Sequence, residues 1–302
     1  MPHFDKKYTF ILMKHMKKRL STLLIAGLFL TSLSSSAQQV TIDSNWVKDQ
    51  EPFRIAGTLY YVGSYDLASY LISTTKGLIL INTGVEGSDT MIRRHIEKLG
   101  FKFSDIKILL ATHAHFDHVG AMAAIKQATG AKLMIHKKDA PLLADGGSSD
   151  VILGGHGPMF PAVKADHLLK DRDLVQLGDM QIMVLHHPGH TKGACSFLFS
   201  VNDATREYRV LIANMPSILS ATKFPSTRGY SSVGKDYAFT LNAMPKVQFD
   251  IWLASHASQF DMHKKHKDGD GYDPEAFFDQ AGYDAAIADL KNAYLKKAGV
   301  TQ

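Results

Sequence analysis

A histidine-rich motif, H-x-H-x-D-H, constrains this chain more than any other feature. Its four polar side chains, His113, His115, Asp117 and His118, lie within six residues. They come after a mostly apolar stretch, Ile106 to Leu110, which predicts a buried strand that runs into the motif. A tight loop can turn alternate side chains toward one point, and the end of a buried strand holds such a loop rigidly. The motif therefore predicts a metal site.

Cysteine usage limits the chemistry of such a site. Cys195 is the only cysteine, whereas the chain has 15 histidines. A single thiol cannot form an intrachain disulfide, a zinc ribbon or a thiol redox pair. Any bound metal must therefore be held by imidazole and carboxylate groups. The net charge of +5 is modest, and no basic stripe interleaved with aromatic residues is present, so nucleic-acid binding is not expected.

Two later histidines are candidates for the same metal site. His190 lies in the sequence P-G-H-T and His256 in the sequence A-S-H-A, and each follows an apolar run that resembles a strand. With the motif, they make six potential ligands, which divide into two sets of three. Three protein ligands leave a metal ion an open coordination position, which is typical of catalytic sites and not of structural ones.

The amino-terminal region has the layout of a bacterial secretory signal. Basic residues around Lys17 precede a short apolar run, Leu20 to Leu33, and small residues follow it up to Ala37. We expect a signal peptide over residues 1–37, cleaved near Ala37, and a periplasmic mature domain over residues 38–302. The apolar run is too short for a typical membrane anchor, and no cysteine lies directly after it to carry a lipid.

The mature chain alternates predicted strands and helices, which indicates a layered α/β domain. We predict one domain in two halves, without an internal linker. A Gly-rich stretch, residues 146–157, is expected to be a mobile surface loop. Helices are predicted after the cap residue Ser88, over Gly120 to Thr129, and after Asp273 and Pro274. The predicted strands are 59–62, 70–73, 77–81, 106–110, 132–135, 175–177, 180–185, 194–199, 208–213 and 249–254.

The order of these motifs resembles the metallo-β-lactamase superfamily, from about Phe53 to the carboxy-terminal helix. The closest resemblance is to class B β-lactamases of the third subclass. It implies a four-layer αβ/βα sandwich with two Zn²⁺ ions per chain at one edge between two sheets. It also implies which side chains hold each ion. The first zinc would be bound by His113, His115 and His190, and the second by Asp117, His118 and His256.

The stretch Leu211 to Pro216 favours the lactamase among the enzymes of this superfamily. Many other members carry a metal-bridging aspartate there and the first lactamase subclass carries a cysteine, but this stretch contains neither. By the resemblance, the chain hydrolyses the β-lactam amide bond of penicillins, cephalosporins and carbapenems with a metal-bound hydroxide and confers antibiotic resistance. Asp117 would orient the hydroxide, Ser217 would bind the substrate carboxylate, and residues 146–160 would form a flap. We expect a monomer.

Two residues depart from the family pattern, and two other functions stay open. Met215 stands where the third subclass commonly has serine, and Asn82 stands where the superfamily usually has an aspartate behind the ligands.

The first alternative function is a lactone or thioester hydrolase of the same fold, since fold alone does not select among these activities. The second is a non-catalytic periplasmic zinc-binding protein, although a storage protein needs no open coordination positions.

Several conspicuous side chains are not assigned to the site. We expect surface or loop positions for most of the remaining histidines, buried packing for Cys195, and packing without a binding role for the two tryptophans. His186 and His187 are candidates for supporting the His190 loop. The residues concerned are His136, His156, His167, His186, His187, His263, His266, Trp46 and Trp252.

Overall fold

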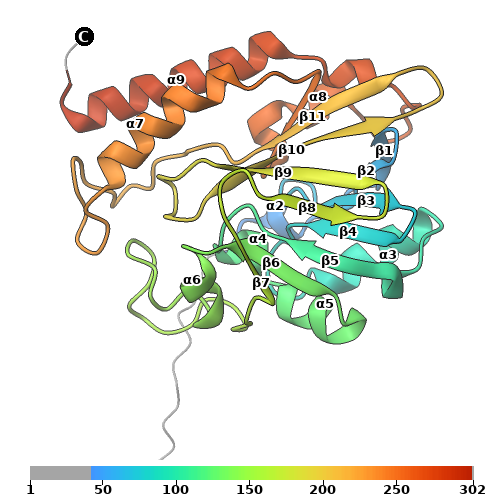
Figure 1. The fold of residues 1–302 in the computed structure, drawn as a ribbon, viewed down its shortest axis with the longest axis horizontal. Helices are drawn as coiled ribbons and strands as arrows, with labels where there is room; N and C mark the ends of the chain where they lie inside the picture. The colour runs from blue at the N-terminus through green and yellow to red at the C-terminus, as the bar shows by residue number, and fades with distance from the viewer. Residues whose placement is uncertain (1–41, 301–302) are drawn as a thin grey trace, which may run out of the picture. The chain divides into compact units, whose positions relative to one another are not determined.

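Two β-sheets packed face to face form the centre of the protein (Figure 1). The computed structural model describes residues 42–300, which belong to one compact unit. The predicted signal peptide lies outside the described residues. One sheet has seven strands in the order β1-β2-β3-β4-β5-β6-β7, and the other has five in the order β12-β11-β10-β9-β8.

The first sheet starts antiparallel and becomes parallel. Its first four strands pair as a meander, and β4, β5, β6 and β7 then run parallel, with helices between β4, β5 and β6. The parallel strands bring their carboxyl ends to one edge of the sheet, and the histidine motif follows β5 at that edge. The strands are β1 (Phe53–Ala56), β2 (Leu59–Tyr61), β3 (Tyr70–Thr74), β4 (Gly77–Ile81), β5 (Ile106–Leu110), β6 (Lys132–His136) and β7 (His167–Leu169).

The second sheet is antiparallel except where its last strand joins. The pair β11 and β12 is parallel, so the chain after β11 and the chain after β12 leave the same end of the sheet. Asn214 follows β11 and His256 follows β12 at this end. The strands are β8 (Leu174–Leu177), β9 (Met180–His186), β10 (Cys195–Asn202), β11 (Glu207–Ala213) and β12 (Ile251–Ala254).

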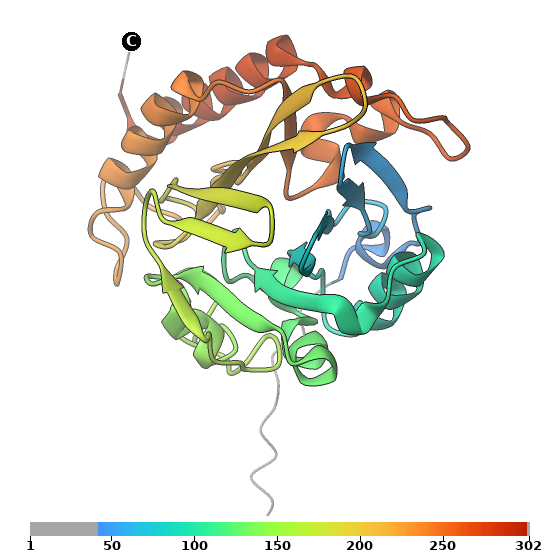
Figure 2. The ribbon, with the colours of Figure 1, turned by 45° about the vertical axis from the view of Figure 1, so that its right-hand side comes forward.

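Helices cover the outer face of each sheet, which gives four layers (Figure 2). In both views α3 and α5 lie on the first sheet, and α7 and α9 lie on the second. This is the αβ/βα sandwich expected from the sequence. No helix within residues 42–300 is long and apolar enough to cross a membrane. The α-helices are α2 (Ser44–Val47), α3 (Asp89–Lys98), α4 (Phe116–Val119), α5 (Met122–Thr129), α6 (Ala140–Ala144), α7 (Val233–Ala243), α8 (Met262–Lys265) and α9 (Gln280–Ala298), and the 3₁₀ helices are η1 (Phe103–Asp105), η2 (Met244–Lys246), η3 (Ala257–Phe260) and η4 (Pro274–Phe277).

The largest hydrophobic cluster fills the space between the two sheets. The continuous apolar strand β4 contributes to both sides of its sheet: Ile79 and Ile81 face the second sheet, and Leu80 faces the helix layer. All three side chains are buried. Burial of one such side chain stabilises the fold by about 1.5–3 kcal/mol. The core therefore fixes the distance between the two sheet edges that carry the polar motifs.

Most predicted elements are present, with differences at their ends. The predicted helix over Gly120 to Thr129 is wrong at its start, because α4 already begins at Phe116 and α5 begins at Met122. The helix is interrupted between α4 and α5, where Gly120 packs against the 84–86 turn. A Cβ atom on residue 120 would lie 2.3 Å from the backbone nitrogen of Glu86. Pro274 opens only the short helix η4. The strands β1 and β7 and helices α6 and α7 were not predicted.

His187 joins the ends of three strands beneath the candidate site. It follows β9, and its Nδ1 lies 2.8 Å from the hydroxyl of Ser196 in β10. That hydroxyl also accepts a hydrogen bond from the backbone N–H of Asn214, just after β11. Burial lowers the pKa of His187 to about 4. The sequence suggested support of the His190 loop, and the contacts of His187 are with Ser196 in β10, after that loop, and through it with Asn214.

Protonation of His187 should destabilise the protein in mild acid. A pKa lowered from 6.5 to about 4 contributes stability that is complete above pH 6.5 and is lost as the pH falls toward 4. The loss from this group between pH 7 and pH 4.5 should be about 2 kcal/mol. The substitution His187→Asn keeps an acceptor near Nδ1 but does not titrate.

The measurement is the free energy of unfolding in urea across that pH range. The variant should lose about 2 kcal/mol less than the parent between pH 7 and pH 4.5. The exposed His167, changed to Asn, serves as the control and should follow the parent. Equal pH dependence in the parent and in His187→Asn would contradict the assignment.

Candidate metal centre

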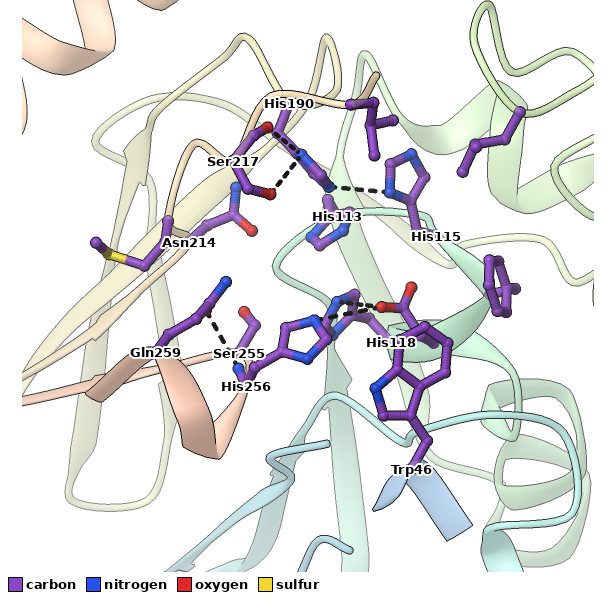
Figure 3. A pocket seen from close by; sticks show the side chains of 15 residues that line it. Trp46, His113, His115, His118, His190, Asn214, Ser217, Ser255, His256 and Gln259 are labelled. Atoms are coloured by element: carbon purple, nitrogen blue, oxygen red, sulfur yellow. Dashed lines mark hydrogen bonds and ion pairs between the residues drawn. The ribbon is translucent and has the colours of Figure 1, made fainter. Parts of the chain in front are cut away.

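The six predicted ligands meet at one edge of the sandwich, around a single cavity (Figure 3). Four come from the loop after β5 and from α4, where the chain turns sharply. His190 comes from the loop between β9 and β10, and His256 from the end of β12. The convergence expected from the sequence is therefore present, and three stretches far apart in the chain supply it.

A buried carboxylate, Asp139, holds two of these stretches together. Its Oδ2 accepts hydrogen bonds from the backbone N–H of Ala114 and from the Thr191 hydroxyl, at 3.1 and 2.6 Å. Its Oδ1 accepts from the backbone N–H of Gly193 at 2.6 Å. A Cβ atom on residue 193 would lie 2.6 Å from the Asp139 carboxyl carbon, so only glycine fits. Asp139 thus fixes the histidine motif against the His190 loop.

The end of β12 is tied to the first sheet in a similar way. The backbone of Asp66 accepts from the N–H of Ala257 at 2.7 Å, and Ala68 donates its N–H to the carbonyl of Ser255 at 3.1 Å. The Asp66 side chain lies 3.0 Å from His256 Nδ1. These contacts place His256 at the edge of the first sheet, although it belongs to the second.

The first set of donors is formed by His113, His115 and His190. One nitrogen of each ring lies within 4.8 Å of the others. The inner nitrogens of two rings, His190 Nε2 and His115 Nδ1, are 3.0 Å apart. The inner nitrogen of the third, His113 Nε2, is buried and has no hydrogen-bond partner among the described residues.

The outer nitrogens of two of these rings each contact an oxygen that can only accept, and His190 Nδ1 lies farther, at 3.3 Å, from the Ser217 hydroxyl. His190 Nδ1 donates to the carbonyl of Ser217 at 2.8 Å, and His115 Nε2 donates to the carboxylate of Asp150 at 3.2 Å. A neutral imidazole has one N–H, so both inner nitrogens then present lone pairs to each other. Two lone pairs at 3.0 Å repel each other unless a positive charge lies between them.

The outer nitrogen of His113 is held through the hydroxyl of Thr112. The hydroxyl lies 3.2 Å from Asn82 Oδ1, to which it can donate, and 3.3 Å from His113 Nδ1. His113 then donates through Nδ1 and directs the Nε2 lone pair inward. A proton could be shared by two of the three inner nitrogens, whereas a metal ion can serve all three. The donor set therefore fits a metal ion.

Asn82 therefore occupies the supporting position that its place in the sequence suggested. It adopts a left-handed backbone conformation, with φ of 59°, which asparagine tolerates better than most residues. Its amide oxygen accepts from both the N–H and the hydroxyl of Thr112. A neutral amide can accept these bonds as an aspartate would, but it adds no negative charge behind the ligands.

The second set contains Asp117, His118 and His256. Asp117 Oδ2 lies 3.1 Å from His118 Nε2 and 3.3 Å from His256 Nε2. Since His256 Nδ1 faces the Asp66 carboxylate, both nitrogens of this ring face negative charge. By the 4.8 Å criterion, Asp117 and His118 group with His113, which belongs to both groups, whereas His256 does not meet the criterion. His118 Nδ1 is buried and has no partner among the described residues.

The pKa shifts follow from burial and from these carboxylates. Burial, with neighbouring imidazoles, holds the pKa of His113 well below its usual value and lowers that of His190 to about 3. Burial alone would lower the pKa of His256, but the bonds to Asp117 and Asp66 raise it to about 9. Burial opposes ionisation of Asp117, yet His118 and His256 hold its pKa well below the usual range. Burial alone would lower the pKa of His115, but the hydrogen bond to Asp150 and its charge raise it. The site therefore presents two neutral imidazoles, His113 and His190, and an ionised carboxylate, Asp117.

A cavity of about 300 Å³ opens over the six side chains. Asn214 and Ser217 lie on the side of the second sheet (Figure 3), and Met215, next to Asn214 in the chain, also lines the cavity. Trp46, from the short helix α2, lies on the opposite side and packs on His256 and Phe116. The expectation that Trp46 has only a packing role is incomplete, because its ring also lines the cavity. Trp252 is buried in the core as expected.

The remaining histidines divide between surface and interior. His156 and His167 are exposed, as predicted. The prediction for His136 is wrong: it is buried and stacks on His186, with ring centroids 4.1 Å apart. His263 and His266 were expected on a solvated face but stack on Tyr65 and Phe53, respectively. Cys195 is buried and unpaired, as expected.

Comparison with known proteins agrees with this geometry. Residues 67–203 match the metallo-beta-lactamase superfamily. The structure is similar to that of a beta-lactamase from Chitinophaga pinensis, with 59% identity, a TM-score of 0.86, and coverage of 87% of this chain and 99% of the other. It is also similar to the class B3 di-zinc metallo-beta-lactamase LRA-12 from an Alaskan soil metagenome, with 55% identity, a TM-score of 0.85 and the same coverage. The chain belongs to the metallo-β-lactamase superfamily, within which it resembles the class B3 enzymes.

The curated relatives share a shorter region. A probable metallo-hydrolase of Bacillus subtilis, YqgX, is 29% identical over 140 residues, which are 45% of this chain and 62% of the relative. The chain thus spans less than two thirds of the length of this relative. The shared region indicates a metal-dependent scaffold and does not specify a substrate.

Removal of His256 should reduce the number of metal ions that the protein retains. If the six donors form two sets, His256→Ala should lower the content of bound divalent metal from two ions per chain to about one. Elemental analysis after dialysis against a weak chelator measures this content. The exposed His167→Ala is the matched control and should retain two ions. Two ions in both variants would exclude His256 as a ligand.

Proposed function

We propose that this protein is a zinc-dependent β-lactamase that hydrolyses the β-lactam amide bond with two Zn²⁺ ions per chain. In this proposal His113, His115 and His190 hold one ion, and Asp117, His118 and His256 hold the other. The inward lone pairs of the three imidazoles in the first set carry the proposal, because a carboxylate, a carbonyl and a hydroxyl fix the outer nitrogens of those rings. The likeness to the beta-lactamase from Chitinophaga pinensis supports the choice of substrate.

The residues around the cavity have complementary tasks in this reaction. Zinc, when bound, supplies a Lewis acid and lowers the pKa of a bound water to about 7. The ionised carboxylate of Asp117 can only accept hydrogen bonds, so it can hold the attacking water by its proton. Its position between His118 and His256 keeps it ionised and directed toward the cavity.

Ser217, which lines the cavity near His190, contributes both its carbonyl and its hydroxyl to the site. Its carbonyl accepts from His190 Nδ1 and also from the Tyr237 hydroxyl, each at 2.8 Å, which anchors the His190 ring. Its half-buried hydroxyl lines the cavity and is the candidate donor to the substrate carboxylate. Met215 has no hydroxyl and contributes apolar surface beside it.

The finer features of the proposal follow from the sequence. We expect penicillins, cephalosporins and carbapenems as substrates, and antibiotic resistance as the consequence of the activity. We also expect cleavage of the signal peptide near Ala37, a mature domain over residues 38–302, a periplasmic location and a monomer. Hydrolysis of a lactone or a thioester is the alternative activity of this scaffold, and zinc binding without turnover is the alternative role. A panel of imipenem, a homoserine lactone and S-lactoylglutathione separates these possibilities.

Replacement of His118 by alanine should abolish most of the activity. Loss of residues that only support a ligand typically costs 10–100-fold, so loss of a ligand should lower kcat/KM for nitrocefin and imipenem by at least about a hundredfold. A chelator should inhibit the parent, and added zinc should restore it. The exposed His167→Ala should keep parental activity. Parental turnover by His118→Ala would refute the assigned role.

A further inference from the structure

Asp150 approaches the metal centre from outside the six ligands. It lies in the Gly-rich loop between α6 and β7, and its Oδ2 is 3.2 Å from Nε2 of His115. Its other oxygen, Oδ1, accepts the backbone N–H groups of Ile152 and Leu153, each at 2.7 Å. One carboxylate therefore binds its own loop with one oxygen and a predicted metal ligand with the other.

The surroundings of Asp150 leave it few other roles. Its side chain is 6% exposed and that of His115 is 4% exposed. Within residues 42–300, His115 is the only side chain with which Asp150 forms an ion pair. A buried charge is costly unless it is paired and hydrogen-bonded, and His115 supplies the ionic partner beside the two backbone N–H groups.

The same loop segment forms part of the cavity wall. Leu153 lines the cavity, and its N–H is one of the two that Asp150 fixes. The turn is closed further by backbone hydrogen bonds from Asp150 to Gly147 and from Gly154 to Asp150, at 3.0 and 3.1 Å. A movement of Asp150 would therefore shift Leu153 in the cavity wall and would also remove the carboxylate that accepts the Nε2 hydrogen of His115.

We infer that Asp150 is a positioning residue that couples the order of the 146–157 loop to zinc bound at His115. By accepting the Nε2 hydrogen, it directs the Nδ1 lone pair of His115 toward His113 and His190. Zinc at this site should then hold the loop in place, and an ordered loop should strengthen zinc binding to the same extent, because coupling between two sites is reciprocal. This inference depends on the proposed zinc function.

The substitution Asp150→Asn tests whether the contact between Asp150 and His115 strengthens zinc binding. If the amide oxygen keeps the two backbone N–H groups, the amide NH₂ faces the Nε2 hydrogen of His115, and two donors oppose each other. Zinc affinity, measured by competition with a chromophoric chelator, should fall by about 10–100-fold. The matched control is Asp145→Asn, which removes the same charge from the start of the same loop, where among residues 42–300 the Asp145 side chain accepts only from the N–H of Ser149. The control should stay within about twofold of the parent.

Hydrogen–deuterium exchange of residues 146–157 tests whether bound zinc holds this loop in place. Zinc should slow exchange of this loop in the parent and in Asp145→Asn, but much less in Asp150→Asn at saturating zinc. If Asp150→Asn matches Asp145→Asn in zinc affinity and in loop protection, the coupling is refuted. If the parent itself neither binds zinc nor hydrolyses nitrocefin, the proposed function fails instead, so the two failures are distinguishable.

Discussion

The site depends on hydrogen-bond acceptors behind the imidazole rings. Ser217 and Asp150 lie against the outer nitrogens of His190 and His115, and Asp66 lies against that of His256. Each is a carbonyl or carboxylate that must take the ring's hydrogen, so the inner nitrogens are left to bind a cation. Such partners also fix ring orientation and raise ligand basicity. Without them, the same histidines could rotate or exchange protons among themselves.

The fold supplies these acceptors by joining two sheets at one edge. Asp139 connects the motif after β5 to the His190 loop, and the backbone around Asp66 connects β12 to the first sheet. The N–H of Cys195, at the start of β10, also donates to the carbonyl of Thr112 at 2.8 Å. Because close-packed interiors resist deformation, the core between the sheets holds these connections to a narrow range of positions.

The convergence of the six candidate ligands was predictable from the sequence, but most of the groups that support them were not. The motif, His190 and His256 each follow an apolar strand, and strand ends meet at an edge in layered α/β folds. Asp66, Asp139 and Asp150 belong to turns or loops without a periodic pattern, so only the tertiary structure shows what they contact. The place of Trp46 in the cavity wall was missed for the same reason. His136 was misplaced because its burial comes from stacking on His186, a residue from the other sheet.

Anomalous scattering from crystals of the zinc-loaded protein, measured at the zinc absorption edge, tests the central claim most directly. The account predicts two peaks per chain, one bounded by His113 Nε2, His115 Nδ1 and His190 Nε2, and the other by Asp117, His118 and His256. The ring nitrogens that face Ser217, Asp150 and Asp66 should lie away from both peaks. A zinc ion bound through one of those outer nitrogens, or no peak among the six side chains, would contradict it.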